Sequence, residues 1–93
     1  MNSSKILKIS YSKSFDKQLD KAPLEVKKAF LKRKELFQKD NFHPLLKNHS
    51  LQGLFKGHYT ININGDWRAM YIKVDNDSIL FTAIGTHSQL YRK

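Results

Sequence analysis

The chain has 93 residues, of which 40% are hydrophobic and 12% aromatic, so we expect one domain over residues 1–93 and exclude a disordered chain. Seventeen Lys plus Arg against eight Asp plus Glu give a formal net charge of +9, which favours polyanionic partners. The chain has no cysteine, which excludes disulfides and thiolate sites.

The chain begins with a strand pattern. Between residues 5 and 11, Leu7, Ile9 and Tyr11 alternate with polar side chains, which predicts a strand with one apolar face.

Two helices are predicted next. Ser12 or Ser14 can cap a short helix that runs to about Lys21, and Pro23 fits the first turn of a second helix. Apolar side chains at helical spacing continue to about residue 39. The sequence therefore predicts a helical hairpin over residues 13–39.

Three strands follow a loop over residues 40–50. Alternation from residue 55 to 63, a turn at Asn64-Gly65, a return strand over 67–74 and a last strand over 79–84 predict an antiparallel meander. The order is β-α-α-β-β-β. This pattern indicates an α+β sandwich in which the helical hairpin covers a largely antiparallel sheet.

The register of the first hairpin decides which side chains share a face. A two-residue turn at Asn64-Gly65 would place the Arg68 guanidinium on the aliphatic face, which is unfavourable. A three-residue loop pairs Ile63 with Trp67 and Asn62 with Arg68, and it separates an apolar from a polar face. We favour the second register, with Gly65 at positive φ.

The polar face and the end of the last strand suggest a catalytic site. His58, Asn62 and Arg68 share the polar face, and His87 and Tyr91 follow the last strand. Cleavage of RNA through the 2′-hydroxyl needs a base, a cation for the phosphate and an acid for the leaving oxygen. Histidine can act as base or acid, arginine binds phosphate, and aromatic rings stack on bases.

The loop over residues 44–53 can bring two further side chains, Lys47 and His49, to the rim of this site. The four histidines lack metal-ligand spacing, so we expect neither a metal nor another cofactor.

Several of these residues also have ordinary structural explanations. His87 could belong to a capped C-terminal turn with Thr86 and Ser88. Asp66 suits a turn, and Trp67 falls on the apolar face, where it would join the core. Both readings of these residues stay open at this stage.

Four segments of the chain resemble the RelE/ParE superfamily of bacterial toxins, most closely its YafQ-like branch. The terminal segment is the most specific, since it is close to the branch's "G-T/S-H-S-x-L-F". The four matching segments are Ile9–Phe15, Leu46–Gly53, Gly65–Tyr71 and Gly85–Tyr91.

The resemblance implies a microbial-RNase-type sandwich and a set of site residues. It makes His87 the leading catalytic residue and places His49 and Asp66 in the site, with Trp67 beside them. Asn62 stands where the YafQ-like pattern has a histidine.

Two other positions depart from the YafQ-like branch. Tyr91 replaces its terminal phenylalanine, and Arg68 matches the arginine of the RelE and YoeB branches. In combination, we expect His87 as acid, His49 as base with Asp66, Arg68 as phosphate ligand and Tyr91 as stacking residue. Side chains expected to contact RNA are Lys47, Lys56, His58, Asn62 and Trp67.

The resemblance further implies the toxin of a type II toxin–antitoxin system, an endoribonuclease that cuts messenger RNA in the ribosomal A site. Its partners would be a cognate antitoxin with an acidic or amphipathic segment, messenger RNA, and the ribosome with its ribosomal RNA. No apolar run approaches membrane-spanning length, so a cytoplasmic location is expected.

Two other functions are compatible with the same fold. One is a ParE-like gyrase inhibitor, and the other is a catalytically weak protein that only binds RNA or an antitoxin.

Overall fold

The computed structural model describes residues 7–91 and contains a five-stranded sheet with three helices. The predicted β-α-α-β-β-β order is confirmed, and a two-residue strand and a short terminal helix are additional. The elements are β1 (Lys8–Tyr11), α1 (Lys13–Lys21), α2 (Leu24–Lys39), β2 (His49–Ser50), β3 (His58–Asn64), β4 (Trp67–Asp75), β5 (Ser78–Thr86) and α3 (His87–Tyr91). Within residues 7–91, no helix has the length and apolar character needed to cross a membrane.

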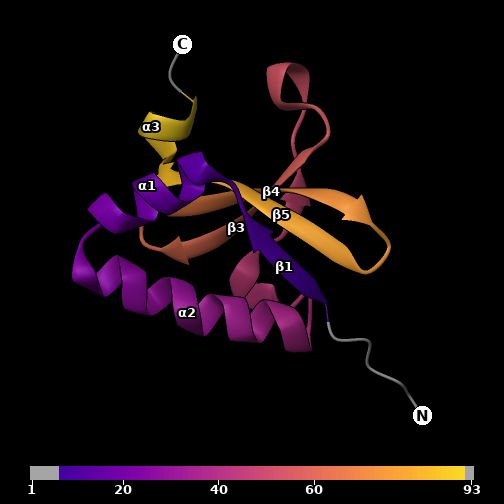
Figure 1. Cartoon of the computed structure of the whole chain (residues 1–93), viewed down its shortest axis with the longest axis horizontal. Helices are drawn as coiled ribbons and strands as arrows, with labels where there is room; N and C mark the ends of the chain where they lie inside the picture. The colour runs from indigo at the N-terminus through magenta and orange to yellow at the C-terminus, as the bar shows by residue number, and fades with distance from the viewer. Residues whose placement is uncertain (1–6, 92–93) are drawn as a thin grey trace.

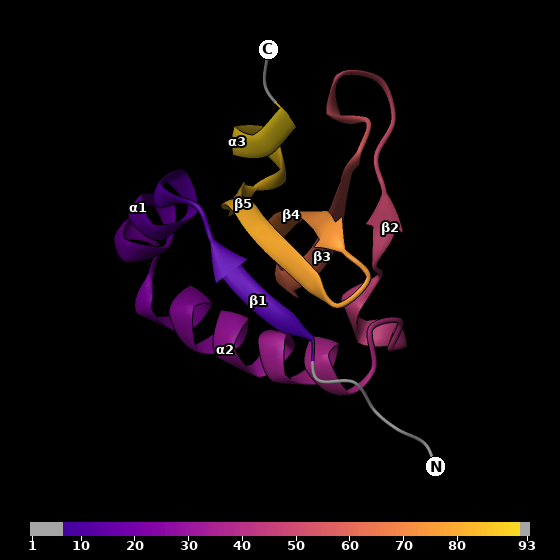
Figure 2. The ribbon, with the colours of Figure 1, turned by 45° about the vertical axis from the view of Figure 1, so that its right-hand side comes forward.

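The sheet has the strand order β1-β5-β4-β3-β2, and α1 and α2 cover one of its faces (Figures 1 and 2). β1 runs parallel to β5, whereas all other neighbours are antiparallel. The two ends of the described chain therefore meet in adjacent strands, with Lys8 opposite Ser78 and Tyr11 opposite Phe81.

Ser12 decides where α1 begins. Its hydroxyl accepts a 3.0 Å hydrogen bond from the backbone N–H of Phe15, which satisfies one of the free donors at the start of the helix. The same hydroxyl donates to the carbonyl of Thr82 in β5 at 3.2 Å, so the cap also attaches α1 to the sheet. Ser12 is thus the capping residue, and Ser14 is the second residue of the helix.

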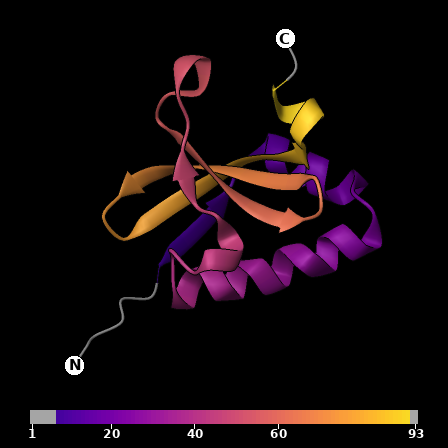
Figure 3. The same cartoon turned by 180° about the vertical axis from the view of Figure 1, so that it is seen from behind.

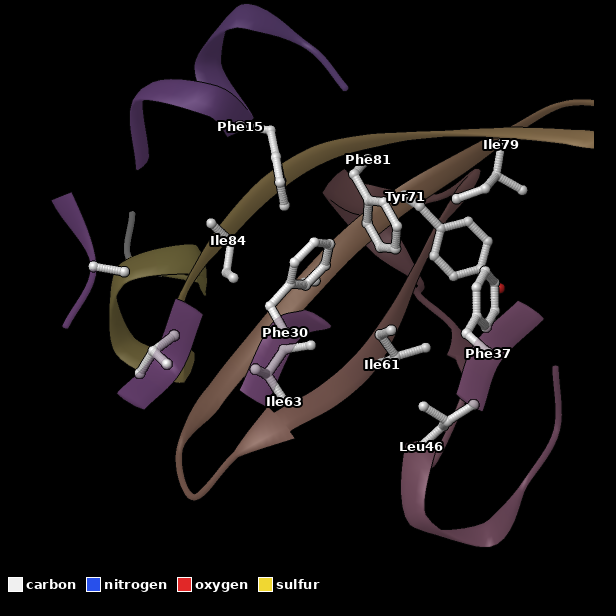
Figure 4. Close-up of a cluster of buried hydrophobic side chains, with 13 residues drawn as sticks. Phe15, Phe30, Phe37, Leu46, Ile61, Ile63, Tyr71, Ile79, Phe81 and Ile84 are labelled. Atoms are coloured by element: carbon white, nitrogen blue, oxygen red, sulfur yellow. The ribbon is translucent and has the colours of Figure 1, made fainter. Parts of the chain in front are cut away.

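Aromatic rings fill the space between the helices and the sheet (Figure 4). Phe30 of α2 meets Phe81 of β5 edge-on at 5.3 Å between ring centroids. Phe37 of α2 packs against Tyr71 of β4 at 5.2 Å. Because each such side chain contributes about 1.5–3 kcal/mol when buried, this layer fixes how the helical hairpin lies on the sheet.

The β3–β4 hairpin agrees with the predicted register in one part only. Asn62 lies opposite Arg68, as predicted, and Gly65 has a φ of +52°. The predicted pairing of Ile63 with Trp67 is wrong, because Asn64 lies opposite Trp67 and the register shifts between Asn62 and Asn64. The bulge absorbs the extra residue, so Ile63 remains in the core although the turn is shorter than predicted.

The opposite face of the sheet carries α3 and the loop between β2 and β3 (Figures 1 and 3). Thr60 and Met70 lie opposite each other in β3 and β4 and are only 1% and 4% exposed, respectively. The centre of this face is therefore shielded from solvent. For this reason the apolar side chain of Met70 is accommodated although its neighbours are polar.

Candidate active site

One hollow of about 350 Å³ gathers most of the predicted site residues. β2, β3, β4, α3 and the loop before β2 all contribute to its lining. The lining residues are Lys47, His49, Leu51, Thr60, Asn62, Arg68, His87 and Tyr91.

His49 reaches the hollow from the edge strand β2, where its side chain is exposed. Its Nδ1 lies 2.7 Å from the carbonyl oxygen of Lys47. Because a carbonyl oxygen can only accept, Nδ1 must carry the proton in this hydrogen bond. The neutral ring then has its lone pair on Nε2, and among residues 7–91 no hydrogen bond occupies that nitrogen. His49 can therefore accept a proton at Nε2.

Lys47 makes this arrangement possible through its backbone. With φ 47° and ψ 43°, it adopts the left-handed conformation, which costs a non-glycine residue about 1–2 kcal/mol. The conformation ends the short 3₁₀ turn Pro44–Leu46 and directs the chain back toward β3. The preceding residue, Leu46, is fully buried and anchors the turn in the core.

Arg68 projects from β4 into the hollow, opposite Asn62 of β3. Its Nη1 donates to the carbonyl of Gly65 at 2.8 Å and to the carbonyl of Trp67 at 3.0 Å. One amino group thus fixes the guanidinium on the hairpin turn. The remaining N–H groups have no other partner among residues 7–91 and can bind an anion.

His87 is the first residue of α3, and two hydrogen bonds between Thr86 and Gln89 define the start of this helix. The backbone N–H of Thr86 donates to Gln89 Oε1 at 2.9 Å, and the backbone N–H of Gln89 donates to Thr86 Oγ1 at 3.2 Å. These reciprocal bonds form a capping box. A Cβ atom at Gly85 would lie 3.0 Å from Gln89 Oε1, so glycine leaves room for the cap.

Tyr91 packs against His87, which lies one turn earlier in α3. Its ring centroid lies 4.6 Å from that of His87. Phe55 of the loop before β3 also meets the Tyr91 ring edge-on, at 5.5 Å between centroids. Tyr91 therefore connects His87 to the loop and restricts the orientation of the imidazole.

Four predicted site residues lie outside the lining of this hollow. Trp67 packs against the core and borders a different hollow with Gln18 and Leu90, in agreement with its apolar position in the sequence. Asp66 is an exposed turn residue whose backbone carbonyl, rather than its carboxylate, contacts the site: it accepts a 2.9 Å hydrogen bond from the N–H of His87.

The remaining two, Lys56 and His58, belong to the loop and the start of β3. Lys56 is exposed, whereas His58 is half-buried with its ring 6.4 Å from that of Phe55. Neither is brought together with the histidines of the hollow.

The sequence reasoning did not predict α3, although its signal was present. The spacing Thr86-x-x-Gln89 is that of a capping box, but a five-residue helix is too short to show an apolar period. The hydrogen bond between Asn48 and Tyr71 had no local signal, because the two residues lie 23 positions apart in the chain.

The hollow combines two imidazoles, a guanidinium and an ammonium group around one space. This set can transfer protons and bind a phosphate in one place. Among residues 7–91, no group of His, Asp or Glu side chains is arranged to hold a metal ion.

Comparison with protein families gives a direct match. The family of YafQ, described as a bacterial toxin of a type II toxin–antitoxin system, matches residues 7–92. The chain belongs to the YafQ toxin family. It is accordingly the toxin of a type II toxin–antitoxin system, and the predicted resemblance to the YafQ-like branch is confirmed.

Solved structures agree with the YafQ assignment. YafQ from Escherichia coli strain BL21(DE3) is 25% identical, with a TM-score of 0.65 over 91% of this chain and 98% of that one. A chain of the Escherichia coli DinJ–YafQ complex is 26% identical, with a TM-score of 0.64 over 91% and 98%. A YoeB/ParE toxin from Agrobacterium tumefaciens, only 14% identical, shares the fold with a TM-score of 0.72 over 87% and 99%. A search among curated proteins gave no significant match.

Proposed function

We propose that this YafQ-family toxin is an endoribonuclease that cleaves messenger RNA in the ribosomal A site. The observation that supports the proposal most strongly is the single hollow lined by His49, Arg68, His87 and Tyr91. His49 comes from β2, Arg68 from β4, and the other two residues from α3. Their side chains supply the proton-transfer and phosphate-binding groups that RNA cleavage requires.

The proposed reaction uses the 2′-hydroxyl of the RNA as nucleophile. His49 accepts the hydroxyl proton at Nε2, and the 2′-oxygen attacks the adjacent phosphorus. The bond from phosphorus to the 5′-oxygen breaks, and His87 donates a proton to that oxygen. The products are a 2′,3′-cyclic phosphate and a free 5′-hydroxyl. The reaction begins with His49 neutral and His87 protonated.

Positive charge in the hollow would stabilise the pentacoordinate phosphate. Arg68 is oriented by its two backbone hydrogen bonds, and its free N–H groups suit phosphate oxygens. Lys47 lines the same hollow and adds a second cation. Asn62 offers an amide for hydrogen bonds to the RNA, and the Tyr91 ring offers a surface for a base.

The other predicted RNA contacts would be made with nucleotides farther along the bound RNA. Lys56 is exposed on the loop before β3, which rises from the same face of the sheet as α3 (Figure 3). His58 and Trp67 would contact RNA that extends beyond the hollow, and the Asp66 carboxylate would help the base His49 from outside the lining.

The net charge of +9 supports the proposed partners, because messenger RNA and ribosomal RNA are polyanions. A cognate antitoxin with an acidic or amphipathic segment would bind the same basic protein, by analogy with the DinJ–YafQ complex of Escherichia coli. Both partners place the proposed action in the cytoplasm.

The test is primer extension on messenger RNA after induction of the wild type, His87→Ala and His43→Asn. His43 caps the 3₁₀ turn by accepting from the N–H of Leu45, and asparagine preserves a capping acceptor. We expect cleavage by the wild type and the His43 variant, and a ~10²–10⁴-fold loss in His87→Ala.

Undiminished cleavage by His87→Ala would contradict the mechanism. DNA breaks with intact messenger RNA would instead indicate a ParE-like gyrase inhibitor. Normal growth on induction of the wild type would indicate a protein that only binds RNA or an antitoxin.

A further inference from the structure

Asn48 connects the loop before β2 to the core of the protein. Its Oδ1 accepts a 2.7 Å hydrogen bond from the hydroxyl of Tyr71 in β4. Its Nδ2 donates at 2.9 Å to the carbonyl oxygen of Asn41, at the beginning of the loop. Both ends of the amide are therefore used, and Asn48 joins the buried sheet to a segment that is otherwise largely exposed.

The position of Asn48 in the chain relates this connection to the active site. It lies between Lys47 and His49, whose mutual hydrogen bond fixes the imidazole. The left-handed backbone of Lys47 persists only if its surroundings hold it. Buried Leu46 holds the chain on one side of Lys47, and Asn48 holds it on the other.

We propose that the hydrogen bond between Tyr71 and Asn48 positions the catalytic base. It keeps the carbonyl of Lys47 against Nδ1 of His49, and thereby keeps the neutral imidazole in the form with a basic Nε2. Tyr71 and Asn48 are positioning residues that do not touch the substrate. The assignment of His49 as base rests on the proposed function, whereas the effect on the imidazole does not.

Tyr71 is well suited to this task. Its side chain is only 2% exposed, and its ring is held by Phe37 and Phe81 at 5.2 and 5.9 Å between centroids. Burial raises the pKa of Tyr71 to about 12. The hydroxyl therefore remains a donor throughout the pH range in which histidines titrate.

The experiment measures the protonation form of His49 directly, by ¹⁵N NMR of the full chain. In the wild type, we expect neutral His49 to carry its proton on Nδ1. In Tyr71→Phe and in Asn48→Ala, the Lys47 carbonyl is no longer held, so we expect a mixture of Nδ1–H and Nε2–H forms. On ribosome-bound messenger RNA, kcat should fall about 10–100-fold with little change in KM.

Two variants serve as controls. Tyr59→Phe removes a hydroxyl from the ring stacked on Tyr71 at 5.2 Å, and it should leave both the form of His49 and cleavage unchanged. Asn48→Asp preserves an acceptor for Tyr71, and it should retain the Nδ1–H form. Tyr71→Phe removes the hydroxyl and keeps the ring packing, and Asn48→Ala changes a residue outside the core cluster. The two variants therefore remove the same hydrogen bond from its two ends.

A wild-type proportion of the Nδ1–H form in both Tyr71→Phe and Asn48→Ala would overturn the proposal, whatever happens to cleavage. If the proton of His49 is redistributed in the two variants as expected but the wild type does not cleave RNA, the positioning role stands and the proposed function fails.

Discussion

The backbone N–H of His87 donates a 2.9 Å hydrogen bond to the carbonyl oxygen of Asp66, and this bond joins the start of α3 to the β3–β4 turn. The same turn holds Arg68, through the carbonyl of Gly65. The proposed acid and the proposed phosphate ligand are therefore both attached to the two-residue turn Gly65-Asp66. A change in the shape of this turn should disturb both of them together.

Gly65→Ala tests this coupling. Among residues 7–91, no atom lies within 4 Å of the added Cβ, so the penalty comes from the positive φ of 52° and is about 1–2 kcal/mol in the free energy of unfolding. We expect urea denaturation to show this loss and RNA cleavage to fall at the same time. Gly53→Ala is the matched control, because it has a φ of +66° and equal space but no contact with this turn. Equal losses of cleavage in the two variants would exclude a special role for the turn.

The capping box of α3 gives a second prediction. Gln89→Ala removes the hydrogen bond from the Thr86 N–H to Oε1, whereas the backbone N–H of residue 89 can still donate to Thr86 Oγ1. For the loss of one bond of the capping box, we expect the free energy of unfolding to fall by ~0.5–1.5 kcal/mol. Cleavage should fall as well, because His87 is the first residue of the helix whose cap is weakened. Ser88→Ala, at an exposed position of the same helix, should change neither quantity. Wild-type cleavage by a Gln89→Ala protein that has lost stability would show that α3 does not orient His87.

Tyr91 can act through its ring or through its hydroxyl, and two substitutions separate these roles. Tyr91→Phe preserves the ring contacts with His87 and Phe55, so we expect most of the cleavage activity to remain. Tyr91→Ala removes both contacts, and we expect a loss of about 10-fold or more because His87 is no longer fixed. Rates of RNA cleavage under single-turnover conditions provide the measurement. A large loss in Tyr91→Phe would instead assign proton transfer or hydrogen bonding to the hydroxyl.

The raised pKa of Tyr71 predicts how stability depends on alkaline pH. Burial raises its pKa from 10.0 to about 12 in the folded protein, so the neutral phenol is favoured by folding. This contribution is fully present below pH 10 and is lost as the pH rises toward 12. Its size is about 2–3 kcal/mol.

Urea denaturation of the wild type and Tyr71→Phe at several pH values between 9 and 12 isolates this contribution. The wild type should lose more stability over this range than the variant, since the variant has no phenol to ionise at this position. Parallel curves for the two proteins would contradict the assigned burial effect.

Local patterns in the sequence were sufficient for most of the fold. The alternation of apolar residues before Tyr11 and after Phe55, and the helical spacing between them, predicted the elements that build the core. They failed where an element is too short to have a period: β2 has two residues, both exposed, and α3 has five. The bulge at Ile63 also escaped prediction, because alternation alone cannot distinguish a longer loop from an extra residue in the strand.

The sequence predicted which residues form the candidate site, but not the contacts that orient them. His49, Arg68 and His87 were expected to act together, and the structure brings them to one hollow. Their orientation depends on contacts between distant segments, such as Tyr71 with Asn48 and His87 with Asp66. Such pairs have no spacing rule in the sequence, and they required the structure.

The parallel pairing of β1 with β5 has a consequence for synthesis of the toxin. Lys8 lies opposite Ser78, so β1 can pair with its neighbour in the sheet only after β5 has been synthesised. His87 and Tyr91 follow still later along the chain. A nascent chain therefore has neither a complete sheet nor a complete hollow until β5 and α3 have been synthesised. Any chain that stops before Tyr91 lacks part of the lining of the hollow.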